Sequence, residues 1–295
     1  MYQIKKIAIL LTCHNRKGKT INCLKSLYKA AGFSNASIRF DIFLVDDGST
    51  DGTSEEIAAL YPDINLIKGS GNLFWAGGMR LAWETALSRN EDYDAFLLLN
   101  DDVVLMENFL QSLLHTHLYC LKQFHQPGIY VSSTIDLETQ KISYGGVVVD
   151  KKGIRVKKSN IKPGDVPVSC NMTNANILLV TKFVVNSIGI LDPNYTHQFA
   201  DYDYSLAASR LGIPVLVCPG IGGACINDHG KSWLSPKSTL KQRIDYLHSP
   251  VGLAYKEQLY YLKKNFRLQF PYYFIMLWLK TLFPTFWEKL KKDDH

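Results

Sequence analysis

An apolar run over residues 95–99 stops abruptly at Asn100, Asp101 and Asp102. A buried strand of this kind delivers adjacent polar groups to its carboxyl end, the edge at which open α/β sheets bind their ligands. Buried carboxylates are costly unless positive charge offsets them, and a hard divalent cation that carries phosphate oxygens would do so. The alternative is an ordinary strand-to-helix turn with Asn100 or Asp102 as an N-cap.

Two other connections combine glycines with polar side chains. Asp46 and Asp47 follow the apolar run over 40–45 and open the segment DDGSTDGT. Its glycines allow a ligand to come close to the backbone, and its carboxylates can accept hydrogen bonds from a base or a ribose. A second glycine-rich connection contains Gly71 and Asn72. Neither is a Walker phosphate loop, because no Gly-Lys-Ser/Thr follows, and no Rossmann fingerprint follows the first strand.

The composition is that of an ordinary globular protein. The 295 residues are 46% hydrophobic and 20% charged, which suits one large domain or a main domain with an appendage. A net charge of +6 without a dense basic face argues against nucleic-acid binding and favours a membrane surface or anionic substrates. Six scattered cysteines without a Cys-x-x-Cys pair favour a reducing cytosol. We expect no signal peptide and no transmembrane helix.

Alternating elements predict an α/β fold with a doubly wound, mostly parallel sheet. The expected strands are 7–11, 40–45, 64–67 and 95–99, and the expected helices are 21–31, 53–60 and 77–88. After a helix over about 105–124, short strand-like runs over 129–180 predict a smaller mixed region. It includes an exposed, mobile basic loop over 151–167. A helix over 201–211 and a strand over 215–218 follow.

Several motifs occur in a recognisable order. They are TCHNR at 12–16, VDDGSTDGT at 45–53, GN at 71–72, LLLNDDV at 97–103 and FADYDYSLAASRLG at 199–212. Together they resemble the family 2 glycosyltransferases, inverting enzymes of the GT-A fold that use a nucleotide-diphosphate sugar, and among these the bacterial rhamnosyl- and glycosyltransferases of surface polysaccharide synthesis. The resemblance implies a GT-A domain over 1–235, with a nucleotide-sugar-binding half over 1–104 and an acceptor and catalytic half over 105–235.

The resemblance also implies roles for individual residues. Asp102 would be the ligand of Mn²⁺ or Mg²⁺, with His229 of the late segment NDHGKSW as a second ligand. Asn100 stands where the family frequently has an aspartate, which removes one carboxylate from the motif. Trp75 would form the floor of the sugar site by stacking against the sugar, or else would pack in the core. The nucleotide-sugar-binding set is Thr12, Asn15, Arg16, Asp46, Asp47, Gly71, Asn72, Trp75, Asn100, Asp101 and Lys231.

Asp201 aligns with the catalytic base of this family. Sugar transfer with inversion needs one carboxylate to take the proton of the acceptor hydroxyl as its oxygen attacks the anomeric carbon. Glycoside hydrolysis, by contrast, uses a pair of carboxylates. Ala200 replaces the acid that commonly precedes the base, and Asp203 is a rival for the role. The alternative is that Asp201 and Asp203 are acidic residues at the start of a helix, where the helix dipole stabilises negative charge.

Residues 236–295 are predicted to form a helical C-terminal extension, interrupted at Pro250, Pro271 and Pro284. Aromatic and apolar segments flanked by lysines suit insertion at a membrane interface. Packing on the catalytic domain or on a second subunit of a homodimer is the alternative. Membrane contact would make a lipid-linked glycan a natural acceptor.

The sequence therefore predicts a metal-dependent inverting glycosyltransferase of surface polysaccharide assembly. Its donor would be a UDP-sugar, or else a dTDP-sugar, and its acceptor a glycan or lipid-linked saccharide. The expected location is the cytoplasm, at the inner face of the cell membrane, with no nucleic-acid partner. One alternative is a sugar-1-phosphate nucleotidyltransferase, although the first strand lacks the glycine-rich, basic loop that triphosphate chemistry needs. The other is a non-catalytic membrane-associated scaffold.

Overall fold

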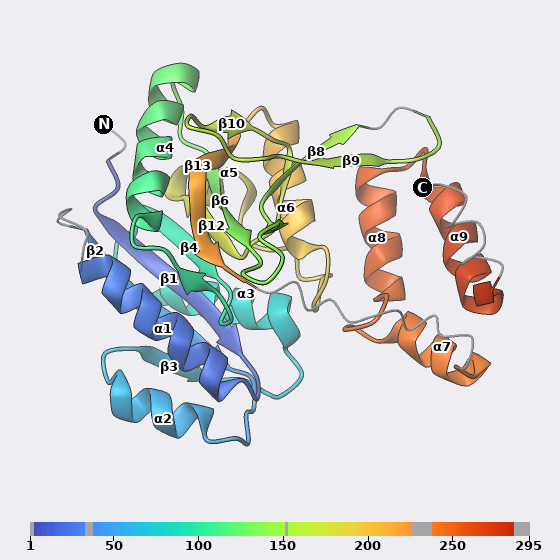
Figure 1. The fold of residues 1–295 in the computed structure, drawn as a ribbon, viewed down its shortest axis with the longest axis horizontal. Coiled ribbons are helices and arrows are strands. Elements are labelled where there is room, and N and C mark those ends of the chain that lie inside the picture. Colours follow the sequence, from blue (N-terminus) through green and yellow to red (C-terminus); the bar gives the residue numbers. More distant parts are fainter. Residues whose placement is uncertain (1–2, 33–37, 151–152, 226–237, 286–295) are drawn as a thin grey trace.

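The computed structural model describes residues 3–32, 38–150, 153–225 and 238–285. Within them, one mixed ten-stranded sheet forms the centre of the molecule, and its main path runs β10-β13-β6-β12-β4-β1-β2-β3 (Figure 1). The amino-terminal half contributes four parallel strands that alternate with helices, as the sequence predicts. These elements are β1 (Lys6–Cys13), α1 (Lys17–Gly32), β2 (Arg39–Asp46), α2 (Thr53–Leu60), β3 (Asn65–Lys68), α3 (Phe74–Ser88) and β4 (Ala95–Leu99).

The second half completes the sheet in a mixed arrangement. Its long strands are β6 (Ile129–Ile135), β12 (Ile177–Thr181) and β13 (Val215–Ala224), with the short β5 (Val104–Leu105), β7 (Ile142–Tyr144) and β10 (Val168–Ser169). β12 lies between β4 and β6 and runs antiparallel to both. The amino end of β12 therefore lies at the same sheet edge as the carboxyl ends of β1, β2 and β4.

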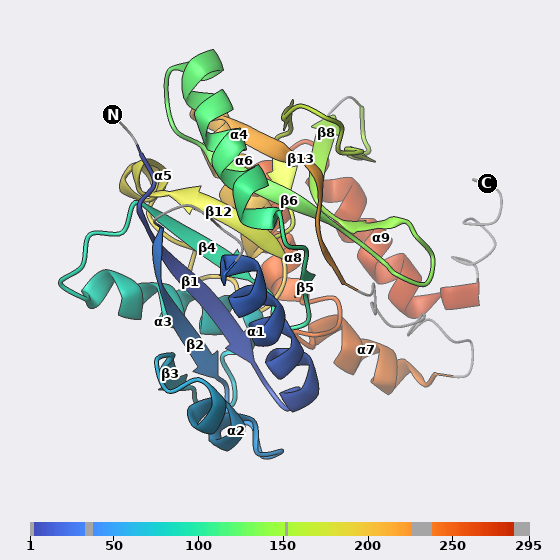
Figure 2. The ribbon, with the colours of Figure 1, turned by 60° about the vertical axis from the view of Figure 1, so that its left-hand side comes forward.

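Helices cover both faces of the sheet, so its central strands are buried on both sides, as wholly apolar runs predict. Ile7, Ile9 and Leu11 of β1 pack with α1, α2 and α4 (Phe109–Phe124), whereas Ala8 and Leu10 pack with α3, α5 (Lys182–Ile188) and α6 (Ala200–Arg210). Figure 2 shows α1 and α4 together on one face. The fold is thus the predicted α/β architecture, with a mixed, mostly parallel sheet.

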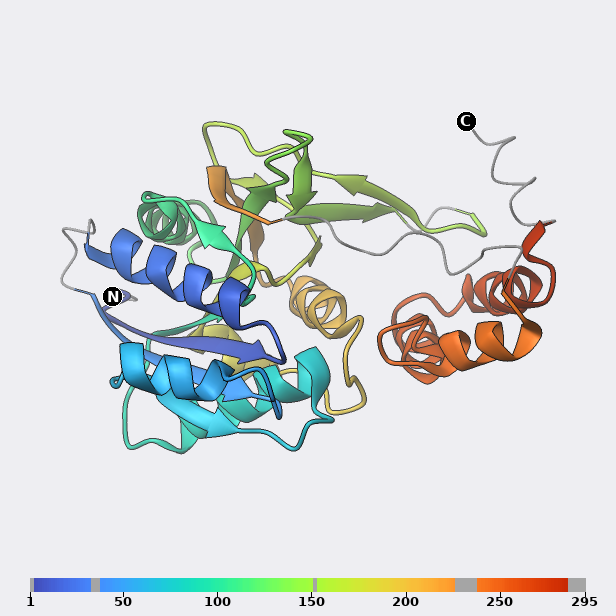
Figure 3. The same cartoon turned by 60° about the horizontal axis from the view of Figure 1, so that its bottom comes forward.

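A separate group of helices follows the sheet and is called the C-terminal lobe below (Figures 1 and 3). It consists of α7 (Leu240–His248), α8 (Tyr255–Asn265) and α9 (Phe270–Leu282). Pro271 lies in the first turn of α9, where its missing N–H is not needed, so it begins this helix rather than interrupting one. In the part of the chain that the structure describes, every helix falls short of the length and apolar character that crossing a membrane requires.

Several local expectations differ from the structure. α3 begins at Phe74 rather than at 77, because the Asp47 carboxylate accepts hydrogen bonds from the amides that open it. α4 begins at Phe109 rather than at 105, because Val104 and Leu105 pair with β13. The basic loop over 151–167 contains a strand, β9 (Lys157–Asn160), which joins β8 (Gly146–Asp150) and β11 (Met172–Thr173) in a second sheet.

Candidate active site

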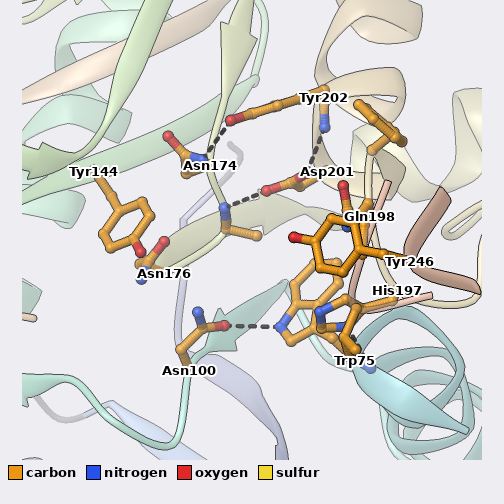
Figure 4. Close-up of a pocket in the computed structure, with 14 residues that line it drawn as sticks. Trp75, Asn100, Tyr144, Asn174, Asn176, His197, Gln198, Asp201, Tyr202 and Tyr246 are labelled. Atoms are coloured by element: carbon orange, nitrogen blue, oxygen red, sulfur yellow. Dashed lines mark hydrogen bonds between the residues drawn. The ribbon is translucent and has the colours of Figure 1, made fainter. Parts of the chain in front are cut away.

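A pocket of about 380 Å³ lies at the carboxyl edge of the sheet, beside α6 and α7 (Figure 4). Its lining comes from segments far apart in the sequence: the start of α3, the end of β4, the residues before β12, the start of α6 and the α7–α8 connection. The residues are Trp75, Asn100, Tyr144, Asn174, Ala175, Asn176, His197, Gln198, Phe199, Asp201, Tyr202, Tyr246, Val251 and Gly252. Asp201 is the one carboxylate among these residues.

Backbone amides hold the carboxylate of Asp201 at the pocket wall. Its Oδ2 accepts a hydrogen bond from the Ala175 amide at 3.1 Å, and its Oδ1 accepts one from the Tyr202 amide at 2.8 Å. Burial raises the pKa of Asp201 to about 6, although these amides favour its charged form. An oriented carboxylate with this pKa is ionised at neutral pH and is a stronger base than an ordinary aspartate.

Asp203, the rival for this role, points elsewhere. It lies buried on another face of α6, where its Oδ2 contacts Nζ of Lys264 at 2.7 Å and its Oδ1 accepts from Nδ2 of Asn265 at 2.7 Å. These bonds join α6 to α8 in the C-terminal lobe. The geometry therefore favours Asp201 over Asp203 as the group that can meet a ligand in the pocket.

Trp75 and Asn100 form the opposite wall. Nε1 of Trp75 donates to Oδ1 of Asn100 at 2.8 Å (Figure 4). The Trp75 side chain is half-buried: it packs against the core beneath α3 and also lines the pocket. The two interpretations of Trp75 from the sequence are therefore compatible, since one part of the ring packs and another part faces the pocket.

Arg16 forms ion pairs with both Asp101 and Asp102. Its Nη1 contacts Oδ1 of Asp101, and its Nη2 contacts Oδ2 of Asp102, both at 3.0 Å. Thr20 also donates to Asp101 through its hydroxyl at 3.0 Å. Burial raises the pKa of Asp101 to about 6, while the Arg16 charge acts in the opposite direction. Three of the sequence-predicted residues thus form one charged cluster at the end of β4.

The chemistry of Asp102 fits a hard divalent cation. Mg²⁺ usually binds through one or two carboxylates together with water and substrate phosphate oxygens, so a full cage of protein ligands is not required. Among the described residues, no group of three or more His, Cys, Asp and Glu side chains is placed to hold a metal. The second predicted ligand, His229, and the predicted diphosphate contact, Lys231, lie outside the described residues.

The Asp47 carboxylate holds the two glycine-rich connections together, whereas the Asp46 carboxylate bonds within and just after the first one. Oδ1 of Asp47 accepts from the Gly71 amide at 2.7 Å, and its Oδ2 accepts from the amides of Leu73 and Phe74 at 2.8 and 2.9 Å. Asp46 accepts from the Ser49 amide at 2.9 Å and from the Ser54 hydroxyl. Both carboxylates are buried. Contact of Asp47 with a nucleotide base stays a prediction.

The segment after β1 completes this edge of the sheet. Asn15 has a φ of 50° and accepts from the Thr50 amide at 2.8 Å, while the backbone N–H of Asn15 donates to the Ser49 hydroxyl at 2.9 Å. Thr12 is buried against Gly78 of α3. The predicted nucleotide-sugar residues of segments 12–16, 46–47, 71–75 and 100–102 therefore come together at one edge, as the strand order requires.

The polar side chains that precede β12 were not among the site residues predicted from the sequence. Asn174 and Asn176 flank Ala175 immediately before the apolar run over 177–180, and both line the pocket. Polar residues at a strand end are the same signal that identified Asn100. Because β12 is antiparallel, however, its amino end is the end that faces the pocket, and the local pattern does not show strand direction.

Comparisons with known proteins agree with this geometry. The family model "Glycosyl transferase family 2" matches residues 8–158, and the chain belongs to this family. No curated protein matches it. Among solved structures, it is similar to the mannosyltransferase PcManGT from Pyrobaculum calidifontis in complex with GDP-Man and Mn²⁺, with a TM-score of 0.50 and 12% identity.

That comparison covers 90% of this chain, and the chain spans 64% of the length of the mannosyltransferase. Residues 1–349 of TarS from S. aureus give a TM-score of 0.49 and 12% identity, over 89% of this chain and 72% of that one. At such identities, the likeness to the mannosyltransferase shows a common GT-A-like fold and nothing finer.

Proposed function

We propose that the chain is a metal-dependent inverting glycosyltransferase. It moves a sugar from a nucleotide-diphosphate sugar to a hydroxyl of a glycan or lipid-linked saccharide. The favoured donor is a UDP-sugar, and a dTDP-sugar is the alternative. The observation that carries this proposal is the placement of Asp201. Its carboxylate faces a pocket whose opposite wall is formed by Trp75 and Asn100, and Asn100 directly precedes Asp101 and Asp102 in the chain.

In this reaction Asp201 acts as the general base. Its carboxylate takes the proton of the acceptor hydroxyl while that oxygen forms a bond to the anomeric carbon. The bond between this carbon and the diphosphate oxygen breaks, and the diphosphate leaves with the electron pair. The amides of Ala175 and Tyr202 hold the base in place, so that little reorganisation is needed when the acceptor arrives.

Asp102 is the residue that we propose to hold Mn²⁺ or Mg²⁺, with His229 as a second ligand. A bound divalent cation would neutralise charge on the departing diphosphate. Arg16 bridges Asp101 and Asp102, so it keeps the two like charges together and orients the Asp102 carboxylate. The edge of the sheet thus separates two tasks, with diphosphate binding at 100–102 and proton transfer at Asp201.

The remaining pocket lining suits a saccharide as acceptor. The described residues that line it contribute side-chain amides and aromatic rings, and no Lys or Arg side chain is among them. Amides pair with sugar hydroxyls, and the flat rings of Tyr144 and Tyr246 offer apolar faces to a pyranose. Nζ of Lys158 lies 4.9 Å from the ring centre of Tyr202, so a positive charge lies beside this wall.

The C-terminal lobe contributes to the same pocket. Tyr246, Val251 and Gly252 line it, and Nε2 of Gln198 donates to the carbonyl of Gly252. The buried Glu257 carboxylate accepts from the amide of Gln198 at 3.2 Å. We therefore propose that the domain over 1–235 works together with the extension over 236–295, although the two were separate in the sequence prediction. The setting that we propose is surface polysaccharide assembly at the inner face of a cell membrane.

A donor screen tests this function. UDP-, dTDP- and GDP-sugars are offered to the purified chain with Mn²⁺ or with EDTA, and both binding and donor hydrolysis are followed. We expect one nucleotide to bind with a metal requirement that Asp102→Ala removes. Absence of affinity for every sugar nucleotide would contradict the proposal, and turnover of a nucleoside triphosphate with a sugar 1-phosphate would support a nucleotidyltransferase instead.

A further inference from the structure

One face of α9 presents apolar side chains to the surrounding solvent. Leu268, just before the helix, is 90% exposed, and Ile275 is 53% exposed. Leu282 is also exposed, seven residues after Ile275, so the two lie on one side of the helix. Leu277 and Thr281 lie on the opposite side and are buried. Within the described part of the chain, the helix therefore packs through one face and has a second, apolar face that is exposed.

The tip of the β8–β9 hairpin lies against this helix, although it is more than a hundred residues away in the sequence (Figures 1 and 3). Nε2 of Gln269 donates to the Gly153 carbonyl, and the Val156 amide donates to the Tyr273 hydroxyl, both at 3.0 Å. Ile154 at this tip is 67% exposed. Two separate segments thus place exposed apolar side chains in the same region of the molecule.

Basic side chains accompany these apolar residues. The Arg155 guanidinium lies 5.7 Å from the ring centre of Tyr272, and Nζ of Lys263 lies 5.3 Å from that of Phe270. Arg267 is exposed directly before Leu268. Over residues 238–285 the sequence contains seven Lys and Arg residues and two acidic ones. The net charge of the lobe is therefore +5, which is most of the net charge of +6 of the whole chain.

We propose that the exposed face of α9, with the β8–β9 tip, binds the surface of an anionic lipid bilayer. Leu268, Ile275 and Leu282 would enter the boundary between headgroups and acyl chains, as the apolar face of an interfacial helix does. Arg155 and Arg267 would meet the headgroup phosphates. This inference rests on the membrane setting of the proposed function and deepens it by naming the surface and its lipid class.

The positive charge of the lobe favours binding to an anionic bilayer over association with a second copy of the chain. Pairing two copies through this face would bring two strongly positive lobes together, and like charges across an interface oppose association. Anionic headgroups supply the complementary charge over an extended, flat area. Helix α9 also lies apart from α3 and α6, which carry pocket residues, so a membrane bound to α9 would leave the donor side accessible (Figure 3).

Vesicle flotation with the full chain tests the proposal. Vesicles of phosphatidylcholine with phosphatidylglycerol are compared with vesicles of phosphatidylcholine alone, at low and high salt. We expect binding to the anionic vesicles that weakens with salt. The double substitution Leu268→Glu with Ile275→Glu should reduce this binding at least tenfold. The matched control is Leu118→Glu with Leu211→Glu, which changes two comparably exposed leucines elsewhere and should leave binding intact.

Donor binding, measured separately on the same variants, shows whether they are folded and keeps this test apart from that of the function. If Leu268→Glu with Ile275→Glu retains donor binding and loses vesicle binding, the proposal is supported even where transfer has not been detected. Equal flotation of that variant and the control would overturn it, as would failure of the unmodified chain to bind anionic vesicles. A dimer that Ile275→Glu dissociates, without vesicle binding, would assign the face to a second copy.

Discussion

The indole Nε1 of Trp75 donates a 2.8 Å hydrogen bond to the side-chain oxygen of Asn100, and this bond joins the first turn of α3 to the end of β4. The amide of Asn100 is thereby oriented at the junction between the pocket and the Asp101–Asp102 cluster. An aspartate at position 100 could accept the same bond. The asparagine thus keeps the contact with Trp75 while leaving two carboxylates, rather than three, at this strand end.

Asn100→Asp is expected to raise the affinity for Mn²⁺ by about an order of magnitude, because it adds a carboxylate beside Asp102 without removing the acceptor for Trp75. Titration calorimetry with the metal alone measures this effect. Asn100→Ala, which removes the acceptor and adds no charge, is the control and should give no gain. Equal affinities for Asn100→Asp, Asp102→Ala and the unmodified chain would show that the metal does not bind at this strand end.

Asp201→Asn should lower the rate of transfer by about 10²–10⁴-fold while sparing donor binding, because it removes the general base and keeps the shape of the side chain. Asp203→Asn is the matched control on the same helix. It should cost stability through its loss of charge beside Lys264, and the transfer rate should change only a few-fold. The reverse pattern in single-turnover assays would make Asp203 the base.

Transfer is expected to fall as the pH drops through about 6, since burial raises the pKa of Asp201 to about 6 and only the ionised form accepts a proton. Stability should respond in the opposite direction. The ordinary pKa is 3.8, so between about 4 and 6 the unfolded chain has already released a proton that the folded chain keeps. Rising pH therefore lowers the contribution of Asp201 to the free energy of unfolding over this window.

The variant Asp201→Asn separates these two effects. At pH 7 it should be more stable than the unmodified chain, by on the order of 1 kcal/mol, because it no longer keeps a charge in a buried position. The difference should vanish below about pH 4, where the carboxylate is neutral in both states. Urea unfolding at several pH values measures this, and a variant that is less stable at every pH would contradict the assignment.

Arg16→Gln should destabilise the protein by about 1–3 kcal/mol at pH 7, because it leaves the buried Asp101 and its neighbour Asp102 without their guanidinium. The loss should shrink below pH 6, as burial has raised the pKa of Asp101 to about 6. Lys29→Gln removes an exposed ion pair with Glu107 and should cost less than about 1 kcal/mol. Similar losses in urea unfolding for both variants would show that the Arg16 cluster contributes no more than a surface pair.

Gly78→Ala tests the contact between α3 and β1. A Cβ at this position would lie 2.7 Å from the Cβ of Thr12, so the helix would have to move away from the strand. We expect a loss of about 1–3 kcal/mol together with weaker donor binding. Gly18→Ala, where a Cβ meets nothing within 4 Å, should instead stabilise α1 by up to about 1 kcal/mol. Thermal unfolding and donor titration on both variants make the comparison.

Much of the fold follows from local patterns. The apolar runs that form β1, β2 and β4 have no alternating polar positions, which is the pattern of strands buried on both faces. Because parallel strands end at a common edge, the polar residues that follow each run are brought together without further information. Arg16, Asp47 and Asn100 lie at one edge of the sheet for this reason. The segment over 151–167 was less predictable, since β9 has four exposed residues and no apolar pattern.

The choice between Asp201 and Asp203 depended on tertiary structure. Both lie in the first turn of α6, so local sequence treats them alike. Packing of α6 against α8 turns Asp203 toward Lys264 and Asn265 and leaves Asp201 at the pocket. The same packing brings Tyr246 to the site, from a part of the chain that the sequence patterns assigned to a separate extension.

The sequence by itself determined the class of fold, the sheet edge at which polar residues gather and the acidic residues that lie there, because these depend on strand ends and on periodicity within short segments. Tertiary structure decided which carboxylate faces the pocket, which charge neutralises Asp101 and Asp102, and that β12 runs antiparallel and so adds Asn174 and Asn176. Those outcomes depend on contacts between segments far apart in the chain, and the energy of such contacts is absent from any local pattern.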